Sequence, residues 1–199
     1  MLEHLPPAPS GVLEVGCGTG ELALGLSAAG HRVVAIDPDA PDGEIFRRVS
    51  LEEFTATQPF DAVVASRSLH HIRDVSAAVD KIADLLRPQG ILVLNEHAWD
   101  RFDEPTARWY LRHLATRDPR AAASIDECLR EWQRDHAGLH GYATMRRELD
   151  RRFAERYFRW RPYLYGELGD PSLEAEERRL IAAGELEPTG FRYVGRVRG

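Results

Sequence analysis

The sequence predicts an α/β protein with a largely parallel β-sheet, because stretches typical of buried strands alternate with stretches of helical periodicity. The clearest repeat begins with the apolar segment 12–15, which runs into three alternate glycines. Leu22 and Leu26 then recur at helical spacing, and a second apolar segment follows at 32–36. A strand, a short helix and a second strand form a βαβ unit, which requires parallel strands and a right-handed crossover.

The alternation of strands and helices continues to residue 95. A short third strand is expected within 45–54, and the apolar run 60–65 predicts a much clearer buried strand. The next helix carries one apolar stripe and leads through the turn 88–90 into a strand at 91–95. The stripe consists of Val75, Val79, Ile82 and Leu86. The first ten residues contain three prolines, which predicts an extended lead-in and not a helix.

The second half of the chain predicts an insertion followed by a late pair of strands. The periodicity of 103–152 is helical, and the segment is too long for one crossover helix. The stretch 157–165 alternates aromatic and basic residues, as a strand with two unlike faces does. A helix is expected from Ser172 to Gly184, and a last strand at 190–197. The whole chain, 1–199, is therefore predicted to be one domain that contains a helical insertion.

Composition and charge limit the class of protein. A chain of 199 residues can bury one sizeable core. The net charge of −6 makes a nucleic-acid partner unexpected, since such a protein needs a basic face, and favours a small-molecule partner. Cys17 and Cys128 are too few for a disulfide framework, and no apolar run is long enough to span a bilayer. A protein of the reducing cytoplasm without a membrane segment is therefore expected.

The glycines between the first strand and the first helix predict a ligand-binding loop. Gly16, Gly18 and Gly20 permit positive φ angles and let a ligand approach the backbone, and a helix N-terminus favours an anionic group. Asp37 ends the second strand at the same edge of the sheet, where its carboxylate can accept both hydroxyls of a ribose. The glycines alone also suit a plain strand-to-helix turn, but with this acid they indicate a nucleoside-containing cofactor.

The spacing of the glycines excludes two common nucleotide classes. A dinucleotide-binding loop has the pattern G-x-G-x-x-G, and Glu21 occupies the position of its third glycine. A glutamate there would repel a pyrophosphate. No lysine follows the glycines as it does in a triphosphate-binding loop. Neither a dinucleotide nor a nucleoside triphosphate is therefore the expected ligand.

Four motifs in order resemble the class I S-adenosylmethionine-dependent methyltransferases. They are the segment 14–20, Asp37, the strand 60–65 with the following 69–72, and the segment 86–92. The two late strands resemble the terminal hairpin of that family. The resemblance implies a Rossmann-like seven-stranded sheet of order 3-2-1-4-5-7-6, in which only strand seven is antiparallel, with the helical insertion after strand five.

The resemblance implies S-adenosylmethionine as the cofactor and assigns a role to each matching position at its methionine end. Gly16, Gly18 and the backbone of Cys17 would face the methionine part. Glu14 would hold either the loop or the amino group of the cofactor. Ser66, at the end of the fourth strand, would contribute a backbone or side-chain contact to the same end.

The adenosine end of the cofactor is matched by residues that follow the second and third strands. The resemblance implies that Asp37 binds the ribose hydroxyls and that Pro38 lies beside the adenine. Leu51 and Glu52 would flank the adenine edge, with the alternative that Glu52 belongs to a solvated helix start.

The insertion is expected to cover the cofactor. The family usually carries helices for this purpose before its first strand, and ten residues precede Gly11 here. The insertion leaves the sheet at the carboxyl end of strand five, on the same edge as the cofactor, so it can serve as the cap. Its aromatic residues would either wall a flat acceptor or form its own core. They are Trp99, Phe102, Trp109, Tyr110, Trp132 and Tyr142.

Two histidines are the candidate catalytic bases. Methyl transfer is an in-line displacement, and a base assists it when the acceptor is a hydroxyl or a protonated amine. His97 follows strand five, and His140 lies four residues after His136, so that the latter two share a helix face unless the chain turns between them. Glu96 would orient His97 or act itself, and His70 would serve catalysis or order its loop. No residues show metal-ligand spacing, so no metal is expected.

The expected function is methyl transfer from S-adenosylmethionine to a small molecule at oxygen, nitrogen or carbon. A methyltransferase of RNA or protein is the first alternative, and it would use the arginine-rich stretch 146–161 as a basic face, although a solvated helix surface explains the same charges. A non-catalytic module that binds S-adenosylmethionine is the second. A homodimer is among the assemblies that the sequence allows.

Overall fold

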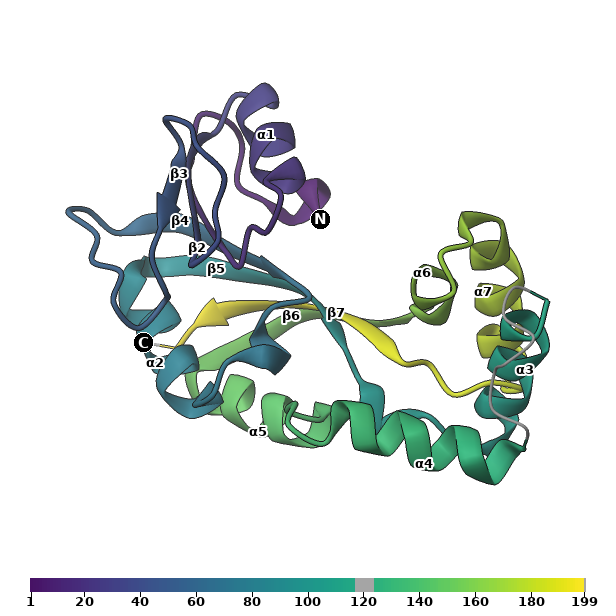
Figure 1. Cartoon of the computed structure of the whole chain (residues 1–199). Coiled ribbons are helices and arrows are strands. Elements are labelled where there is room, and N and C mark those ends of the chain that lie inside the picture. The colour runs from purple at the N-terminus through teal and green to yellow at the C-terminus, as the bar shows by residue number, and fades with distance from the viewer. Residues whose placement is uncertain (117–123, 199) are drawn as a thin grey trace. The chain divides into compact units, whose positions relative to one another are not determined.

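The computed structural model describes residues 1–116 and 124–198 (Figure 1). The chain divides into two compact units. Unit 1 comprises Met1–Glu96, Ala143–Phe158 and Arg192–Gly199, and unit 2 comprises His97–Tyr142 and Arg159–Phe191. The predicted insertion is therefore shared between the units, because its part from Ala143 onward packs with unit 1. Residues 117–123 of the insertion lie outside the described residues.

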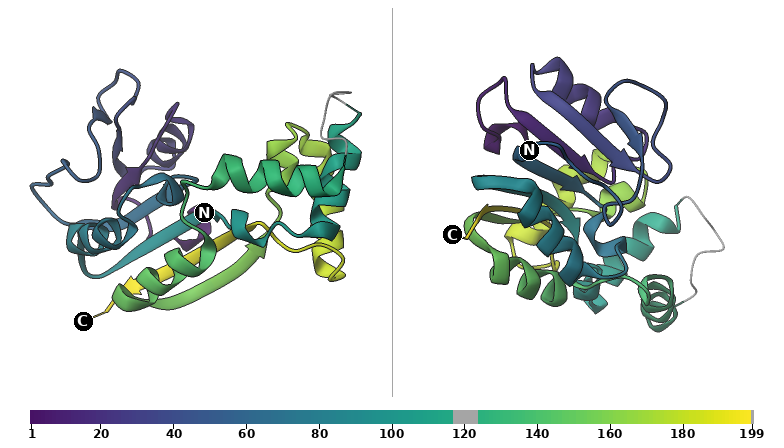
Figure 2. Two further views of the ribbon diagram at one scale, coloured as in Figure 1. Left: turned by 60° about the horizontal axis from the view of Figure 1, so that its bottom comes forward. Right: turned by 90° about the vertical axis from the view of Figure 1, so that its left-hand side faces the viewer.

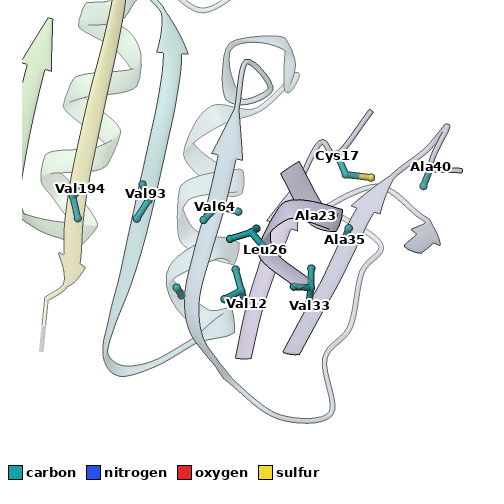
Figure 3. Packing of buried hydrophobic residues seen from close by; sticks show 11 residues of the cluster. Val12, Cys17, Ala23, Leu26, Val33, Ala35, Ala40, Val64, Val93 and Val194 are labelled. Atoms are coloured by element: carbon teal, nitrogen blue, oxygen red, sulfur yellow. The ribbon is translucent and has the colours of Figure 1, made fainter. Parts of the chain in front are cut away.

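One seven-stranded sheet has the order β3-β2-β1-β4-β5-β7-β6, as the resemblance implied. The pairs from β3 across to β5 are parallel. Figure 3 shows the strand that carries Val194 running opposite to the strands that carry Val93 and Val64. The predicted antiparallel seventh strand is thus confirmed. The strands are β1 (Gly11–Val15), β2 (Arg32–Asp37), β3 (Phe46–Arg48), β4 (Phe60–Ser66), β5 (Leu86–His97), β6 (Phe153–Arg161) and β7 (Gly190–Val197).

The register of β1 brings the loop-bearing ends of three strands to one edge of the sheet. Val15 is level with Ile36 of β2 on one side and with Ala65 of β4 on the other. Parallel strands in this register place the residues that follow them side by side. The glycines after β1, Asp37 at the end of β2 and Ser66 at the end of β4 therefore share this edge.

Helices cover both faces of the sheet in unit 1. The helix α1 (Glu21–Ala28) lies on one face, and α2 (Val75–Leu85) and α5 (Tyr142–Arg152) lie on the other (Figures 1 and 2). Leu26 and Ala23 of α1 are fully buried against the apolar side chains of the sheet (Figure 3). Each large apolar side chain buried in this way contributes about 1.5–3 kcal/mol. Asp74 begins α2 as its N-cap and accepts a hydrogen bond from the Ala77 amide.

Unit 2 has its own apolar core. Phe102, Trp109 and Trp132 are at most 9% exposed and belong to this core. Of the two interpretations of these aromatic residues, the structure therefore supports the insertion's own core. The helices of unit 2 are α3 (Glu104–Leu114), α4 (Ile125–His136), α6 (Leu164–Glu167) and α7 (Glu174–Ala182).

Three element boundaries differ from the prediction. The strand expected at 157–165 is β6, which begins directly after α5 and ends before Pro162, whose ring cannot donate to a strand ladder. Leu164 and Tyr165 lie in α6 instead. Leu86, predicted on the apolar stripe of the preceding helix, instead begins the fifth strand, because it pairs with Phe60 of β4. The lead-in contains one 3-10 turn, Leu2–His4. None of the described helices is long and apolar enough to cross a membrane.

The arginine-rich stretch 146–161 is largely neutralised within the chain. Five of its seven arginines form ion pairs, namely Arg146, Arg147, Arg151, Arg152 and Arg161. Arg151 contacts Asp80 at 2.8 Å and Arg152 contacts Asp84 at 2.9 Å, so two acids of α2 face α5. Little positive charge remains for a nucleic-acid backbone, which weakens the alternative of a macromolecular substrate.

Asp80→Ala should lower the melting temperature in low salt and much less in high salt, because Asp80 pairs with both Arg151 and Arg152. The hydrogen bond from Arg151 lowers the pKa of Asp80, so this contribution is present at neutral pH and is lost as the pH falls through the lowered pKa. Thermal melts at two salt concentrations test this. Asp42→Ala, which removes a single exposed pair with Arg48, is the control, and equal effects of the two variants would contradict the prediction.

Candidate functional site

The loop after β1 is held by backbone hydrogen bonds to the end of β2. The amides of Gly16 and Cys17 both donate to the carbonyl of Ile36, at 2.9 and 3.1 Å, and the Gly20 amide donates to the carbonyl of Cys17 at 2.8 Å. The φ angles of Gly16, Gly18 and Gly20 are 72°, 50° and 85°, in the left-handed region that favours glycine. The prediction that this loop needs glycines for its backbone conformation is confirmed.

The three glycines differ in what surrounds them. A Cβ at Gly16 would lie 2.3 Å from Cβ of Ser68, and one at Gly20 would lie 2.5 Å from the ring of Phe46. These two glycines are therefore required for packing within unit 1. A Cβ at Gly18 would meet nothing within 4 Å. Gly18 is exposed and adjoins open space, which is the property expected of a position that a ligand approaches.

The carboxylate of Asp37 lies directly beside this open position. Its Oδ2 accepts a hydrogen bond from the Gly18 amide at 3.0 Å, and its Oδ1 accepts one from the Asp39 amide at 2.9 Å. Asp37 is half-buried, so both oxygens retain lone pairs for a further donor. The predicted partnership of the glycine loop and Asp37 is therefore present in the structure.

Glu14 is buried beneath the loop and lacks a full set of partners. It is 2% exposed, and its Oε2 has no hydrogen-bond partner among the described residues. The pKa of Glu14 is raised to about 7, because burial and, to a smaller extent, the charge of Asp37 outweigh the opposing hydrogen bond from the Ala23 backbone. An unpaired buried carboxyl oxygen is costly, so this group is suited to bind a cationic or hydrogen-donating ligand.

The amide of Cys17 helps to hold the glycine loop, whereas its thiol is buried in the core. The side chain is 7% exposed and belongs to the apolar core between α1 and the sheet (Figure 3). Burial, followed by the charges of Glu14 and Asp37, raises the pKa of the thiol to about 11. The thiol is therefore neutral at pH 7 and is not a nucleophile.

The other residues predicted at the cofactor site lie in unit 1 as well. Pro38 is exposed and follows Asp37 directly. Leu51 is 5% exposed and Glu52 is exposed, and both lie in a turn after β3, so the alternative of a helix start at Glu52 is wrong. Ser66 is half-buried and is level with Asn95 of β5.

Glu96 has partners that the sequence analysis missed. Its carboxylate accepts hydrogen bonds from the amides of Ser68 and Leu69 and lies 2.6 Å from Nδ1 of His70. The hypothesis that Glu96 orients His97 is therefore replaced by one in which it orders the loop after β4. Of the two interpretations of His70, ordering of its loop is supported. The sequence predicts that β4 and β5 end side by side. The spacing of residues along the chain does not predict that the Glu96 side chain bonds to the loop after β4.

The two candidate bases both lie in unit 2. His97 is 2% exposed and stacks on Tyr163, with ring centroids 4.0 Å apart. Its ring also meets His136 edge-on at 5.3 Å. His140 is half-buried and lies in the turn after α4, which ends at His136. The chain therefore turns between these two histidines, and they do not share a helix face.

The acids that line the loop define the kind of ligand it can hold. Glu14 and Asp37 present carboxyl oxygens, and Gly18 provides open backbone in the loop between β1 and α1. Hydroxyl and ammonium groups suit these acceptors, whereas a pyrophosphate would be repelled. The residues present therefore fit the ribose and amino acid parts of S-adenosylmethionine. Among the described residues, no three His, Cys, Asp or Glu side chains are grouped as metal ligands.

Comparisons with solved structures agree with this fold. The chain is similar to an S-adenosylmethionine-dependent methyltransferase from Mesorhizobium loti, with a TM-score of 0.64 and 17% identity over 98% of this chain and 94% of that one. It is also similar to 1,6-didemethyltoxoflavin-N1-methyltransferase of Burkholderia thailandensis, with a TM-score of 0.58 and 15% identity over 96% of this chain and 72% of that one.

Comparisons of sequence identify the family. The chain is 35% identical to an uncharacterised methyltransferase of Mycobacterium bovis over 53% of this chain and 57% of that protein. It is 31% identical to the ubiquinone biosynthesis O-methyltransferase of Rhodopseudomonas palustris over 42% of this chain and 38% of that protein. It thus spans about two fifths to three fifths of the length of these relatives. A family model described as a methyltransferase domain matches residues 2–159, and the chain therefore belongs to the methyltransferase domain family.

Proposed function

We propose that this protein transfers a methyl group from S-adenosylmethionine to a small-molecule acceptor. The observation that carries the proposal is the open position at Gly18, bounded by the carboxylate of Asp37 and by the unpaired Oε2 of Glu14. Relatives named for ubiquinone biosynthesis and for didemethyltoxoflavin support a small acceptor.

The residues of unit 1 would divide the binding of the cofactor among them. Asp37 binds the ribose hydroxyls, and Glu14 attracts the amino group. Gly18 leaves room for the methionine part, and the backbone of Gly16 and Cys17 faces it. The bound cofactor would supply a methyl group on a sulfonium centre, which leaves the protein to align the acceptor and exclude water.

Four further positions complete the proposed cofactor site. Pro38 and Leu51 are apolar and suit the faces of the adenine, and Glu52 suits its polar edge. Ser66 contributes to the methionine end from the end of β4.

The two candidate bases are histidines of unit 2. We assign the role of general base to His97 or His140, for acceptors whose hydroxyl or ammonium proton must be removed. Acceptors that need no base would not require either residue.

Isothermal titration with S-adenosylmethionine, S-adenosylhomocysteine and NAD tests the proposal. Micromolar binding of the first two without binding of NAD is the expected result. Absence of binding to S-adenosylmethionine and S-adenosylhomocysteine would refute the proposed cofactor, and binding without any transfer to candidate acceptors would favour the non-catalytic module.

The affinity for S-adenosylhomocysteine should rise with pH up to about 7 and then level off, because the Glu14 carboxylate that attracts the ammonium group has a pKa of about 7. In the free protein the same raised pKa makes the free energy of unfolding fall as the pH rises. The folded state holds a proton that the unfolded state releases above the ordinary carboxyl pKa, so the free energy of unfolding falls by about 1.4 kcal/mol per pH unit up to pH 7.

Glu14→Gln should therefore flatten both pH profiles. Titrations and thermal melts between about pH 5 and about pH 8, a range that includes the pKa of about 7, give the two slopes for each protein. A pH dependence of binding that survives in this variant would show that another group is responsible.

A further inference from the structure

A buried carboxylate at the end of β5 is bonded to one loop through both of its oxygens. Glu96 is 1% exposed. Its Oε1 accepts hydrogen bonds from the amides of Ser68 at 3.0 Å and Leu69 at 2.8 Å, and its Oε2 lies 2.6 Å from Nδ1 of His70, which is 2% exposed. Two backbone amides and a buried imidazole nitrogen thus share this one carboxylate. Loss of the carboxylate would remove the acceptor of both amides, which is costly.

The loop that Glu96 holds contains a strained residue. Arg67 has a φ of 55°, a conformation that a residue with a Cβ adopts at a cost of about 1–2 kcal/mol. Its amide donates to the carbonyl of Asn95 at 2.8 Å, and the next two amides are those that Glu96 accepts. Strain of this kind persists only where the surroundings over-determine the backbone. The end of β5 thus determines the path of the chain after β4.

The same loop sets the position of the glycine loop. The hydroxyl of Ser68 donates to the carbonyl of Val15 at 2.9 Å. The Cβ of Ser68 also occupies the space that a side chain on Gly16 would need, at 2.3 Å from an ideal Cβ there. Ser68 is therefore in direct contact with the start of the candidate cofactor loop, and a shift of Ser68 would move Val15 and Gly16.

We propose that Glu96 and His70 are positioning residues that hold the glycine loop in its cofactor-binding geometry through Ser68. The contacts run from Glu96 to the Ser68 amide and from the Ser68 side chain to Val15 and Gly16. This inference rests on the proposed function, since it concerns the same cofactor site, but neither Glu96 nor His70 is assigned a contact with the cofactor.

Glu96→Ala should weaken the binding of S-adenosylhomocysteine by about tenfold or more, because the amides of Ser68 and Leu69 lose their acceptor and the loop relaxes. Hydrogen exchange should become faster in peptides that cover 66–72 and 14–18. Glu96→Gln should recover much of the affinity, since its amide oxygen still accepts from Ser68 and Leu69. Ser68→Ala should weaken binding while residues 66–72 remain closer to the exchange rates of the wild type.

Asp61→Ala is the matched control. Asp61 also accepts a backbone hydrogen bond, from the Gly11 amide at 2.6 Å, and it pairs with Arg87 at 2.5 Å, but it lies at the opposite ends of β1 and β4. This variant should lower the melting temperature and leave the affinity for S-adenosylhomocysteine unchanged. Equal losses of affinity in Asp61→Ala and Glu96→Ala would overturn the positioning role, because general destabilisation would then explain both.

Three other results would overturn the proposal. They are wild-type affinity in Glu96→Ala despite faster exchange at 66–72, unchanged exchange at 66–72, and wild-type affinity in Ser68→Ala. Wild-type affinity in Ser68→Ala would overturn the proposal even if Glu96→Ala does not fold. If the wild-type protein does not bind S-adenosylhomocysteine, the proposed function fails together with the cofactor part of this inference, and the exchange rates still decide whether Glu96 holds the loop.

Discussion

Gly18→Val is expected to abolish the binding of S-adenosylmethionine and S-adenosylhomocysteine while the protein remains folded. No atom lies within 4 Å of an added Cβ, so the branched side chain enters the open space at the candidate site without displacing the core. The φ angle of 50° adds strain of about 1–2 kcal/mol, which the fold should tolerate. Titration and thermal melting of the same preparation separate the loss of binding from the loss of stability.

Gly30→Val provides the control for backbone strain. Gly30 has a φ of 90°, and an added Cβ would make only an ordinary contact with Cβ of Ala8 at 3.6 Å. It lies just before β2, at the opposite edge of the sheet from Asp37. Gly30→Val should lose about as much thermal stability as Gly18→Val and should keep the affinity of the wild type for S-adenosylhomocysteine. If Gly18→Val still bound S-adenosylhomocysteine, the glycine loop would be a structural turn only.

Asp37→Ala is expected to weaken the binding of S-adenosylhomocysteine by about 1.5–3 kcal/mol, roughly 10-fold to 150-fold, because a charged hydrogen bond to the ribose is lost. The variant also removes the acceptor of the Gly18 amide, so part of the effect comes through the loop. Titration calorimetry measures the sum of the two contributions.

A ligand lacking the ribose hydroxyls separates these contributions. An analogue of S-adenosylhomocysteine with both hydroxyls removed should bind the wild type weakly, and it should lose little more affinity in Asp37→Ala. Asp37→Asn, which retains one acceptor oxygen, should show an intermediate loss for the natural ligand. If Asp37→Ala weakened both ligands equally, Asp37 would support the loop and would not bind ribose.

Local signals were sufficient to predict the sheet and the loop. The strands at 12–15, 32–36 and 60–65 are mainly apolar, as buried parallel strands are, with one charged residue in each, and each was correctly placed. The resemblance supplied the strand order, which periodicity alone does not determine. The end of β6 was missed because aromatic residues continue past Pro162, and alternation does not reveal where a strand loses its partner.

The candidate site was predictable where it depends on neighbours at one sheet edge. The proximity of the glycine loop and Asp37 follows from parallel strands that end together, and it was expected, whereas the hydrogen bond from the Gly18 amide to Asp37 was not. The oxygen of Glu14 that has no hydrogen-bond partner is a consequence of burial. The contact between Glu96 and the loop after β4 depends on the direction of the Glu96 side chain at the end of β5. Neither property is encoded in the spacing of residues. The stacking of His97 on Tyr163 likewise joins residues far apart in the chain.

The strand order has a consequence for how this chain is made. β7, the last strand to be synthesised, lies between β5 and β6, so β5 has one unpaired edge until the C-terminal segment Gly190–Val197 emerges from the ribosome. Leu92, Val93 and Leu94 of β5 are fully buried in the finished fold, and such a strand with an open edge is prone to pair with other chains. Completion of the sheet therefore has to wait for β7, and chains that terminate before β7 should aggregate.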